Sequence, residues 1–357
     1  MGRIGCHHWT VDERTGTLTT PDGRVLAWLD GGDPAGYPVI GLHGTPGCRF
    51  SRWPDDALYA AAGVRYVTTD RAGYGRSTRR RGRSVADEAT DVLAVADALG
   101  FERFAIVGGS GGGPHALACA ALLGGRVERV ACQSSLAPLA EPARFAKPAR
   151  FAEPARFAEP ARFAETVRFA ETVRFAGTAR LAGTAQSGGR GLARAEWLAG
   201  MEPEIADELT WAEAGEAVLT RELEQAQQLM AKRIAEDPGA LMGDGAPAAD
   251  VEYLLRPEVI TSFRRIIAEQ ARHGVGGSVD DTLAFVRAWG FDLADITVPV
   301  LLTYGDADTS CPVGHGRFLA ARIPGATVVE TAGGGHLPGD PHEEITATHR
   351  WLRTGSL

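Results

Sequence analysis

Short apolar runs alternate with longer amphipathic stretches along most of this chain. The apolar runs are typical of buried strands and predict strands at residues 24–28, 39–42, 65–69, 104–107, 127–131, 300–304 and 327–330. Helical periodicity predicts helices at residues 55–62, 84–99, 113–123 and 341–352. Strands that alternate with helices in this order predict an α/β fold with a mostly parallel, twisted sheet and helices on both faces.

The predicted helix at 84–99 has recognisable ends. Ser84 offers a capping side chain, Asp87 places a carboxylate in the first turn, and Gly100 follows the last turn. We therefore expect this helix to begin at Ser84 and to stop at Gly100.

A repeat of six residues begins at Glu141 and continues to Ala185, in the form EPARFA and close variants. Because each six-residue step turns a helix by about 240° net, successive Phe side chains would point to several faces. Proline in the early repeats would interrupt a helix, and it is poorly tolerated inside sheets. Residues 136–185 are therefore predicted to be a low-complexity insertion. It is either a partner-binding arm, in which Arg and Phe recur, or a duplicated hexapeptide tolerated in a surface loop.

The rest of the chain divides around this insertion. Residues 186–290 are rich in predicted helix, and we expect them to form a helical lid inserted before the last two core strands. Residues 1–19 are interpreted as an N-terminal tail, and residues 20–135 and 291–357 as an α/β core. The lid tryptophans either line a pocket or belong to the core: Trp197, Trp211 and Trp289.

Composition argues against several classes of protein. The net charge of −8 lacks the basic excess of nucleic-acid binders. No stretch approaches the length of apolar sequence that spans a bilayer, and residues 1–10 lack the apolar segment of a signal peptide. The five cysteines are scattered without C-x-x-C spacing, which is typical of a reduced, cytoplasmic protein with no disulfide frame or zinc site.

The segment from Gly108 to Gly112 reads GGSGG and lies between the predicted strand at 104–107 and the helix that follows. This is the G-x-S-x-G motif in the strand–turn–helix context that makes Ser110 a candidate nucleophile. The turn strains the serine backbone, and its Oγ lies at a helix N-terminus, which favours negative charge. A dinucleotide-binding loop is excluded because Pro114 occupies its last glycine position, and a P-loop because Gly-Lys-Ser/Thr is absent.

A nucleophilic serine requires a base and an acid that orients the base, in the chain order Ser, acid, His for this architecture. His336 follows the predicted strand at 327–330, at the edge of the sheet where ligands bind. Asp306 and Asp308 both follow the predicted strand at 300–304 and are the two candidates for the acid.

Together these motifs resemble those of the α/β-hydrolase superfamily, specifically its lidded serine-hydrolase, esterase-like branch. The family's HG-x-P-G loop occurs at residues 43–47. A family-like loop at residues 70–77 differs at Ala72, where proline is common. The resemblance covers residues 20–135 and 290–355, and the hexapeptide repeat has no part in it.

The resemblance implies a role for each candidate residue. Of the two aspartates, Asp308 occupies the acid position of the family pattern G-x-x-D followed by proline. Ser110 is then the nucleophile and His336 the base. The backbone N–H groups of Thr45 and Gly111 would hold the oxyanion, and no metal or organic cofactor is required.

These features predict a serine hydrolase whose small-molecule substrate is an apolar carboxylic ester or related acyl compound. No nucleic-acid or membrane partner is expected, and the oligomeric state is not indicated. Two alternatives remain: the same triad in C–C bond hydrolysis, lyase or acyl-transfer chemistry, or a non-catalytic small-molecule receptor on the same fold. Of the other histidines, we expect His43 to be structural and His315 to lie at the surface.

Overall fold

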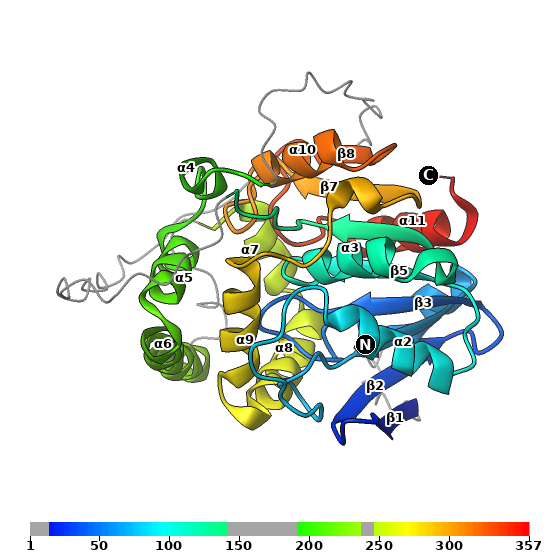
Figure 1. The fold of residues 1–357 in the computed structure, drawn as a ribbon, viewed down its shortest axis with the longest axis horizontal. Helices are drawn as coiled ribbons and strands as arrows, with labels where there is room; N and C mark the ends of the chain where they lie inside the picture. Colours follow the sequence, from blue (N-terminus) through cyan, green and yellow to red (C-terminus); the bar gives the residue numbers. More distant parts are fainter. Residues whose placement is uncertain (1–13, 141–190, 237–245, 357) are drawn as a thin grey trace, which may run out of the picture.

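The structure is a computed structural model that describes residues 14–140, 191–236 and 246–356 (Figure 1). Residues 1–13 of the predicted tail and residues 141–185 of the predicted repeat insertion lie outside the described residues. The expectations for these two segments therefore remain sequence-based.

One sheet forms the centre of the molecule, with the strand order β1-β2-β4-β3-β5-β6-β7-β8. The strands are β1 (Arg14–Thr19), β2 (Val25–Gly32), β3 (Tyr37–Leu42), β4 (Val64–Thr69), β5 (Phe104–Gly109), β6 (Val127–Gln133), β7 (Val300–Gly305) and β8 (Thr327–Thr331). Strand β2 runs antiparallel to β1 and β4, and all other neighbours are parallel. The mostly parallel sheet predicted from the sequence is confirmed.

Strand β1 corrects the interpretation of residues 14–19 as part of a tail. These residues pair in register with β2, from Arg14 opposite Asp30 to Thr19 opposite Val25. Their sequence, RTGTLT, holds a single apolar residue, Leu18, which packs against the core. An edge strand with one solvated face needs no more than that, so the apolar pattern does not reveal it.

Successive strand residues point to opposite faces of the sheet, and helices bury both faces. In β3, Ile40 packs on the face covered by α2 (Glu88–Ala98), α3 (Gly112–Leu122) and α10 (Val313–Arg322), while Val39 packs on the opposite face. The opposite face is covered by α1 (Asp56–Ala61) and α11 (Pro341–Thr354). Burial on both sides explains why strands such as β5 and β7 contain continuous apolar runs.

Helix α2 begins later than the sequence analysis predicts. Residues 84–87 form a turn in which Asp87 Oδ2 accepts hydrogen bonds from the Ser84 backbone N–H at 2.7 Å and from the Ser84 hydroxyl at 2.9 Å. The side chain of Asp87 thus caps the turn, whereas Ser84 was expected to cap the helix. The predicted stop is confirmed, since Gly100 has a φ of +72°, which glycine adopts without steric cost.

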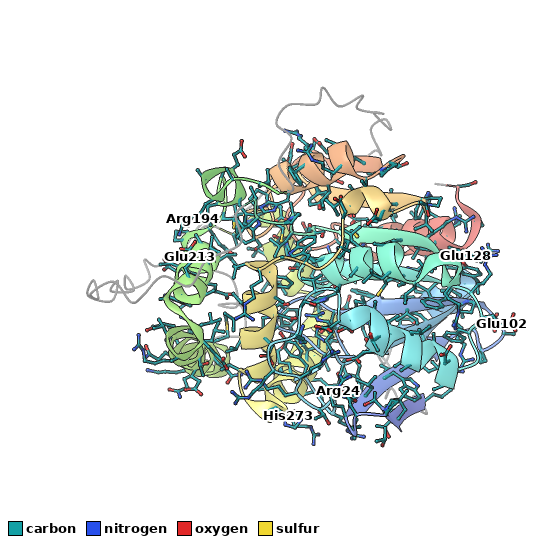
Figure 2. All side chains as sticks on the ribbon, in the orientation of Figure 1. Arg24, Glu102, Glu128, Arg194, Glu213 and His273 are labelled. Atoms are coloured by element: carbon teal, nitrogen blue, oxygen red, sulfur yellow. The ribbon has the colours of Figure 1, made fainter. Side chains whose placement is uncertain are left out.

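Six α-helices occupy the described residues between β6 and β7, and we call them the inserted helices. They are α4 (Arg194–Trp197), α5 (Pro203–Ala214), α6 (Glu216–Glu236), α7 (Ala248–Leu254), α8 (Pro257–Gln270) and α9 (Gly276–Phe285). In Figure 1, α4, α5 and α6 lie at one side of the molecule, with α8 and α9 between them and the sheet. At the surface, α4 and α5 are joined by an ion pair between Arg194 and Glu213 at 2.9 Å (Figure 2).

The described residues on either side of the 141–190 segment lie next to each other. Leu139 and Leu192 form a parallel bridge. The Ala140 N–H donates to the Leu192 carbonyl at 2.7 Å, and the Leu192 N–H donates to the Pro138 carbonyl at 2.8 Å. The two ends of the connection are therefore held together by backbone hydrogen bonds. No helix in the described ranges has both the length and the apolar character needed to cross a bilayer.

Candidate active site

Ser110 lies in the tight turn between β5 and α3, with a φ of +50°. This left-handed conformation costs a residue with a side chain about 1–2 kcal/mol. The turn is held by the Ser110 N–H, which donates to the Gln133 carbonyl at 2.8 Å, and by the Gly113 N–H, which donates to the Ser110 carbonyl at 2.9 Å. The strained serine backbone expected from the G-x-S-x-G motif is confirmed, and strain of this kind is common at functional sites.

The glycines around Ser110 are required by close backbone approach. A Cβ on Gly108 would overlap the Gly112 carbonyl, and a Cβ on Gly112 would overlap the carbonyl of Leu42 in β3. Strand and helix can therefore meet at this turn only without side chains, which leaves the Ser110 hydroxyl at the N-terminus of α3.

His336 and Asp308 are brought together by the loops after β8 and β7. His336 Nδ1 lies 2.9 Å from Asp308 Oδ2, and Asp308 is 4% exposed. Burial opposes the charge on each group, but their mutual hydrogen bond and attraction outweigh it, so the pKa of His336 is raised and that of Asp308 is lowered. The bond occupies Nδ1 and leaves Nε2 as the nitrogen available for proton transfer.

Asp308 is also anchored by the backbone of its own loop. Its Oδ1 accepts hydrogen bonds from the N–H groups of Ser310 and Cys311, both at 2.8 Å. The Ser134 hydroxyl helps to lower the pKa of Asp308. Ser134 follows β6 and has a φ of +49°, a second strained residue beside the site. The sequence analysis assigned it no role, because no carboxylate or motif marks that segment.

Asp306, the alternative acid, is placed differently. It is exposed, and its Oδ1 accepts a hydrogen bond from the Gly333 N–H at 2.7 Å. That bond holds the turn that leads to His336, but Asp306 does not contact the imidazole. Of the two aspartates, Asp308 is thus the one in contact with His336.

Asp250 on α7 supports the histidine loop and was not found by sequence reasoning. Its carboxylate is fully buried and accepts hydrogen bonds from the His336 N–H at 2.8 Å and the Leu337 N–H at 2.7 Å. A Cβ on Gly335 would overlap this carboxylate, so glycine permits the approach. An inserted helix therefore fixes the backbone that carries the imidazole.

Thr45 lies in the loop after β3, beside Gly111, whose added Cβ would overlap the Thr45 side chain. The Thr45 hydroxyl donates to Asp281 Oδ2 at 2.7 Å and accepts from Arg71 Nη2 at 2.9 Å. His43 in the same loop is buried, and its Nε2 accepts the Arg71 N–H at 3.1 Å. Burial, together with the nearby Arg71 charge, lowers the pKa of His43 well below its ordinary value. The structural role expected for His43 is confirmed.

Asp281 on α9 is the centre of a buried polar cluster that reaches this loop. Its carboxylate is fully buried, pairs with Arg71 at 2.5 Å and Arg83 at 2.7 Å, and accepts the Tyr74 hydroxyl at 2.7 Å. His115 Nε2 lies 3.2 Å away. Burial raises the pKa of such a group, but the two arginines outweigh it and hold the pKa of Asp281 well below its usual range. The cluster joins α9 and α3 to the two loops that follow β3 and β4.

A cavity of about 210 Å³ brings the candidate residues together. Ser110, His336, Thr45 and Gly111 line it from the core. The inserted helices supply mostly apolar walls: Trp197, Ile205, Leu209 and Phe285. An apolar cavity with a few polar groups is the usual form of a small-molecule site. Of the three tryptophans considered above, Trp197 lines the cavity, and Trp289 is buried in the main core cluster.

Cys311 lies next to the candidate nucleophile, with its Sγ 4.0 Å from Ser110 Oγ. It is 3% exposed, and burial raises the pKa of its thiol well above the ordinary value, so the thiol stays protonated. The four described cysteines are free and buried. The described residues contain no group of three or more His, Cys, Asp or Glu side chains arranged to hold a metal.

His315 corrects a further expectation, since it is 1% exposed and does not lie at the surface. Its Nδ1 accepts the Ala137 N–H at 2.9 Å, and its Nε2 lies 2.8 Å from the Trp197 carbonyl. Burial lowers the pKa of His315 to about 4. The neutral ring thus fixes Trp197 against the core, and its partners come from distant segments that the local sequence does not indicate.

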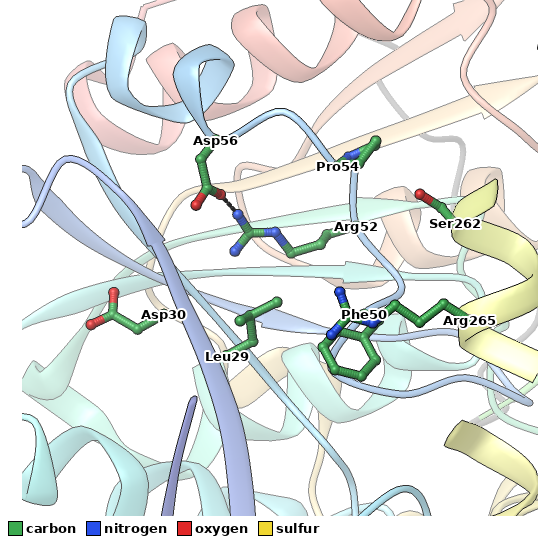
Figure 3. A pocket seen from close by; sticks show the side chains of 8 residues that line it. All are labelled: Leu29, Asp30, Phe50, Arg52, Pro54, Asp56, Ser262 and Arg265. Atoms are coloured by element: carbon green, nitrogen blue, oxygen red, sulfur yellow. Dashed lines mark ion pairs between the residues drawn. The ribbon is translucent and has the colours of Figure 1, made fainter. Parts of the chain in front are cut away.

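A second, smaller cavity of about 80 Å³ lies elsewhere and contains none of the candidate residues (Figure 3). Its charged groups already have partners: Arg52 pairs with Asp56, Asp30 pairs with Arg65, and the Arg265 guanidinium lies 3.5 Å from the centre of the Phe50 ring. We therefore place the candidate site in the larger cavity.

Comparisons with known proteins agree with this fold. Residues 37–179 match a family model described as the alpha/beta hydrolase fold. The chain is 34% identical over 127 residues to a non-heme chloroperoxidase of Streptomyces lividans, which covers 35% of this chain and 46% of that protein. It is 31% identical over 137 residues to a rhodomycin D methylesterase of Streptomyces peucetius, which covers 36% and 42%. The chain thus matches less than half the length of either relative.

Solved structures match over nearly the whole chain. An esterase from Rhodococcus sp. ECU1013 has a TM-score of 0.56 at 17% identity, covering 95% of this chain and 99% of that chain. At such low identity the match shows the fold alone. Together, the family model, the sheet topology and this match show that the chain has the α/β-hydrolase fold.

Proposed function

We propose that the protein is a serine hydrolase in which Ser110, His336 and Asp308 form the catalytic triad. The observation that carries the proposal is the 2.9 Å contact between His336 Nδ1 and Asp308 Oδ2 beside a cavity that Ser110 also lines. Distances between nucleophile and base are often long in unliganded enzymes and tighten when substrate binds.

The proposed reaction has two steps, and in each step one acyl–oxygen bond forms while another breaks. His336 Nε2 takes the proton of Ser110 as Oγ attacks the ester carbonyl, and the Thr45 and Gly111 N–H groups bind the developing oxyanion. The alcohol leaves with the proton from His336. Water then attacks the acyl-enzyme with His336 again as base, which releases the carboxylic acid and restores Ser110.

The cavity sets the size of the proposed acyl group. Its volume is about 210 Å³. Because a cavity of about 150 Å³ holds benzene, this one has room for an acyl group of about eight heavy atoms. The limited volume and mostly apolar walls favour a small carboxylic ester over a long one.

Labelling with a fluorophosphonate probe tests the activated serine. We expect the folded protein to be labelled and Ser110→Ala to lose all labelling. Ser310→Ala is the matched control, because Ser310 also lines the cavity but its hydroxyl is bound to Glu202 Oε1 at 3.1 Å. Labelling of the control should persist. A folded wild-type protein that takes no label would instead favour a non-catalytic receptor.

A panel of aryl esters with increasing acyl length tests the substrate. Activity should be highest for short acyl groups and should fall steeply once the group exceeds the cavity. Labelling of Ser110 without hydrolysis of any ester in the panel would point to C–C cleavage, lyase or acyl-transfer chemistry on the same triad.

A further inference from the structure

Glu208 places a carboxyl group in the cavity that Ser110 lines. It lies on α5, where Glu208 and Leu209 follow Ile205 by three and four residues, so that all three line the same wall of the cavity. The neighbouring wall residues are mostly apolar. A carboxyl group among them loses hydration without an evident structural gain.

Many of the other buried acids in the described chain have an arginine partner, which Glu208 lacks. Several buried carboxylates are each paired with an arginine: Asp70 with Arg49, Asp91 with Arg24, Asp280 with Arg79, and Asp281 with Arg71. The recorded partner of Glu208 is the Thr282 hydroxyl, at a long 3.4 Å. Burial raises the pKa of Glu208 to about 7, and no cation of the described residues contributes to lowering it. Among the residues that the structure describes, its charge thus has no cationic partner.

The other charged groups around the cavity also favour a cationic ligand. Glu202, the residue before α5, adds a second carboxylate beside the cavity, because it accepts a hydrogen bond from Ser310, which lines the cavity. His336 is the lining residue that can become cationic, and it is already held by Asp308. The cavity therefore has an excess of acidic groups, which favours a cationic ligand.

We propose that Glu208 binds a protonated amine on the acyl part of the substrate, so that the preferred substrates are small amino-acyl esters. This inference rests on the proposed hydrolase function. An ammonium group would supply the cation that Glu208 lacks and would restore the ionised carboxylate. The side chains of Ile205 and Leu209 would pack against the methylene groups between the amine and the ester carbonyl.

Matched ester pairs test this specificity. Each amino-acyl aryl ester is compared with the neutral ester of equal length: glycyl with propanoyl, β-alanyl with butanoyl, and 4-aminobutanoyl with pentanoyl. We expect kcat/KM to favour the amino ester in at least one pair, after correction for uncatalysed hydrolysis. Glu208→Gln should lower kcat/KM for that ester by roughly 10- to 100-fold, the usual range for losing a hydrogen bond to a charged group. The neutral esters should change by less than about three-fold, since the carboxylate does not contact them.

Glu204→Gln is the matched control, because Glu204 lies on the same helix, is exposed and does not line the cavity. It should leave kcat/KM for both ester types unchanged. Equal losses for amino and neutral esters in Glu208→Gln, or no amine preference in any pair, would overturn the inference while leaving the hydrolase function intact.

A binding measurement separates this inference from the proposed function. If no ester is hydrolysed and Ser110 takes no label, the hydrolase function fails, and calorimetry with propylammonium then decides the amine site. Binding that Glu208→Gln abolishes and Glu204→Gln retains supports the site. Absence of binding to the wild-type protein overturns it.

Discussion

Replacement of Asp308 by Asn gives a sharp test of the proposed triad, because the structure dictates how the amide would orient. Oδ1 accepts two backbone N–H groups at 2.8 Å, from Ser310 and Cys311. The amide oxygen must stay at that position, since an NH₂ group there would face two donors. The NH₂ group would then point at His336 Nδ1 and force that nitrogen to accept.

The resulting tautomer carries its proton on His336 Nε2, so the imidazole cannot take the proton of Ser110. A triad with this defect loses about 10⁴-fold in kcat, or about 5.4 kcal/mol of transition-state stabilisation. The two backbone hydrogen bonds to Asp308 survive, so the fold should persist. The assay is kcat on the best ester, with urea unfolding as a check that the variant is folded.

Asp306→Asn is the control for this change. The carbonyl oxygen of Asn can still accept the Gly333 N–H, so kcat should fall by less than about three-fold. A folded Asp308→Asn protein that keeps more than a tenth of its activity would refute the tautomer argument. The reverse ranking of the two variants would show that Asp306 is the acid.

Three more predictions follow from the described contacts. Because the pKa of His336 is raised above its ordinary value of 6.5, the free base is lost as the pH falls through a value above 6.5. The acid limb of the kcat/KM profile should therefore lie above pH 6.5. A flat profile across pH 5–8 would contradict a histidine base. Asp281→Asn leaves Arg71 and Arg83 buried without this counter-charge, so it should lower the free energy of unfolding by about 3–5 kcal/mol in urea titrations. Tyr74→Phe removes one hydrogen bond and should lower it by about 0.5–1.5 kcal/mol. Deletion of residues 141–182 should leave the protein folded and labelled by fluorophosphonate, because the ends of the connection are already joined by backbone hydrogen bonds; insoluble protein would mean that the segment packs as structure.

The sequence predicts the core of this fold well because both faces of the sheet are buried. The inner strands β5 and β7 contain continuous apolar runs, and the turn at Ser110 is marked by glycines that the backbone geometry requires. The strand at 14–19 escapes prediction because one face is solvated and its single apolar residue gives no pattern. The apolar pattern of the sequence therefore reveals a strand only where burial requires apolar side chains.

Side chains that act across long sequence separations were not predictable in the same way. Asp250 supports His336 from 86 residues away, and Asp281 reaches Arg71 across 210 residues. Each aspartate sits in a helical stretch whose pattern accounts only for its apolar neighbours. Their partners become evident only when the inserted helices are placed against the core.

The backbone bridge between Leu139 and Leu192 has a consequence for the covalent continuity of the molecule. A single break in the connection between residues 140 and 191 would divide the chain into one piece with β1–β6 and another with β7 and β8. The ladder between β6 and β7, from Val130 with Val300 to Gln133 with Thr303, would still hold the pieces together. Ser110 would then reside on one polypeptide and both Asp308 and His336 on the other, so activity could be reconstituted from two separately produced fragments.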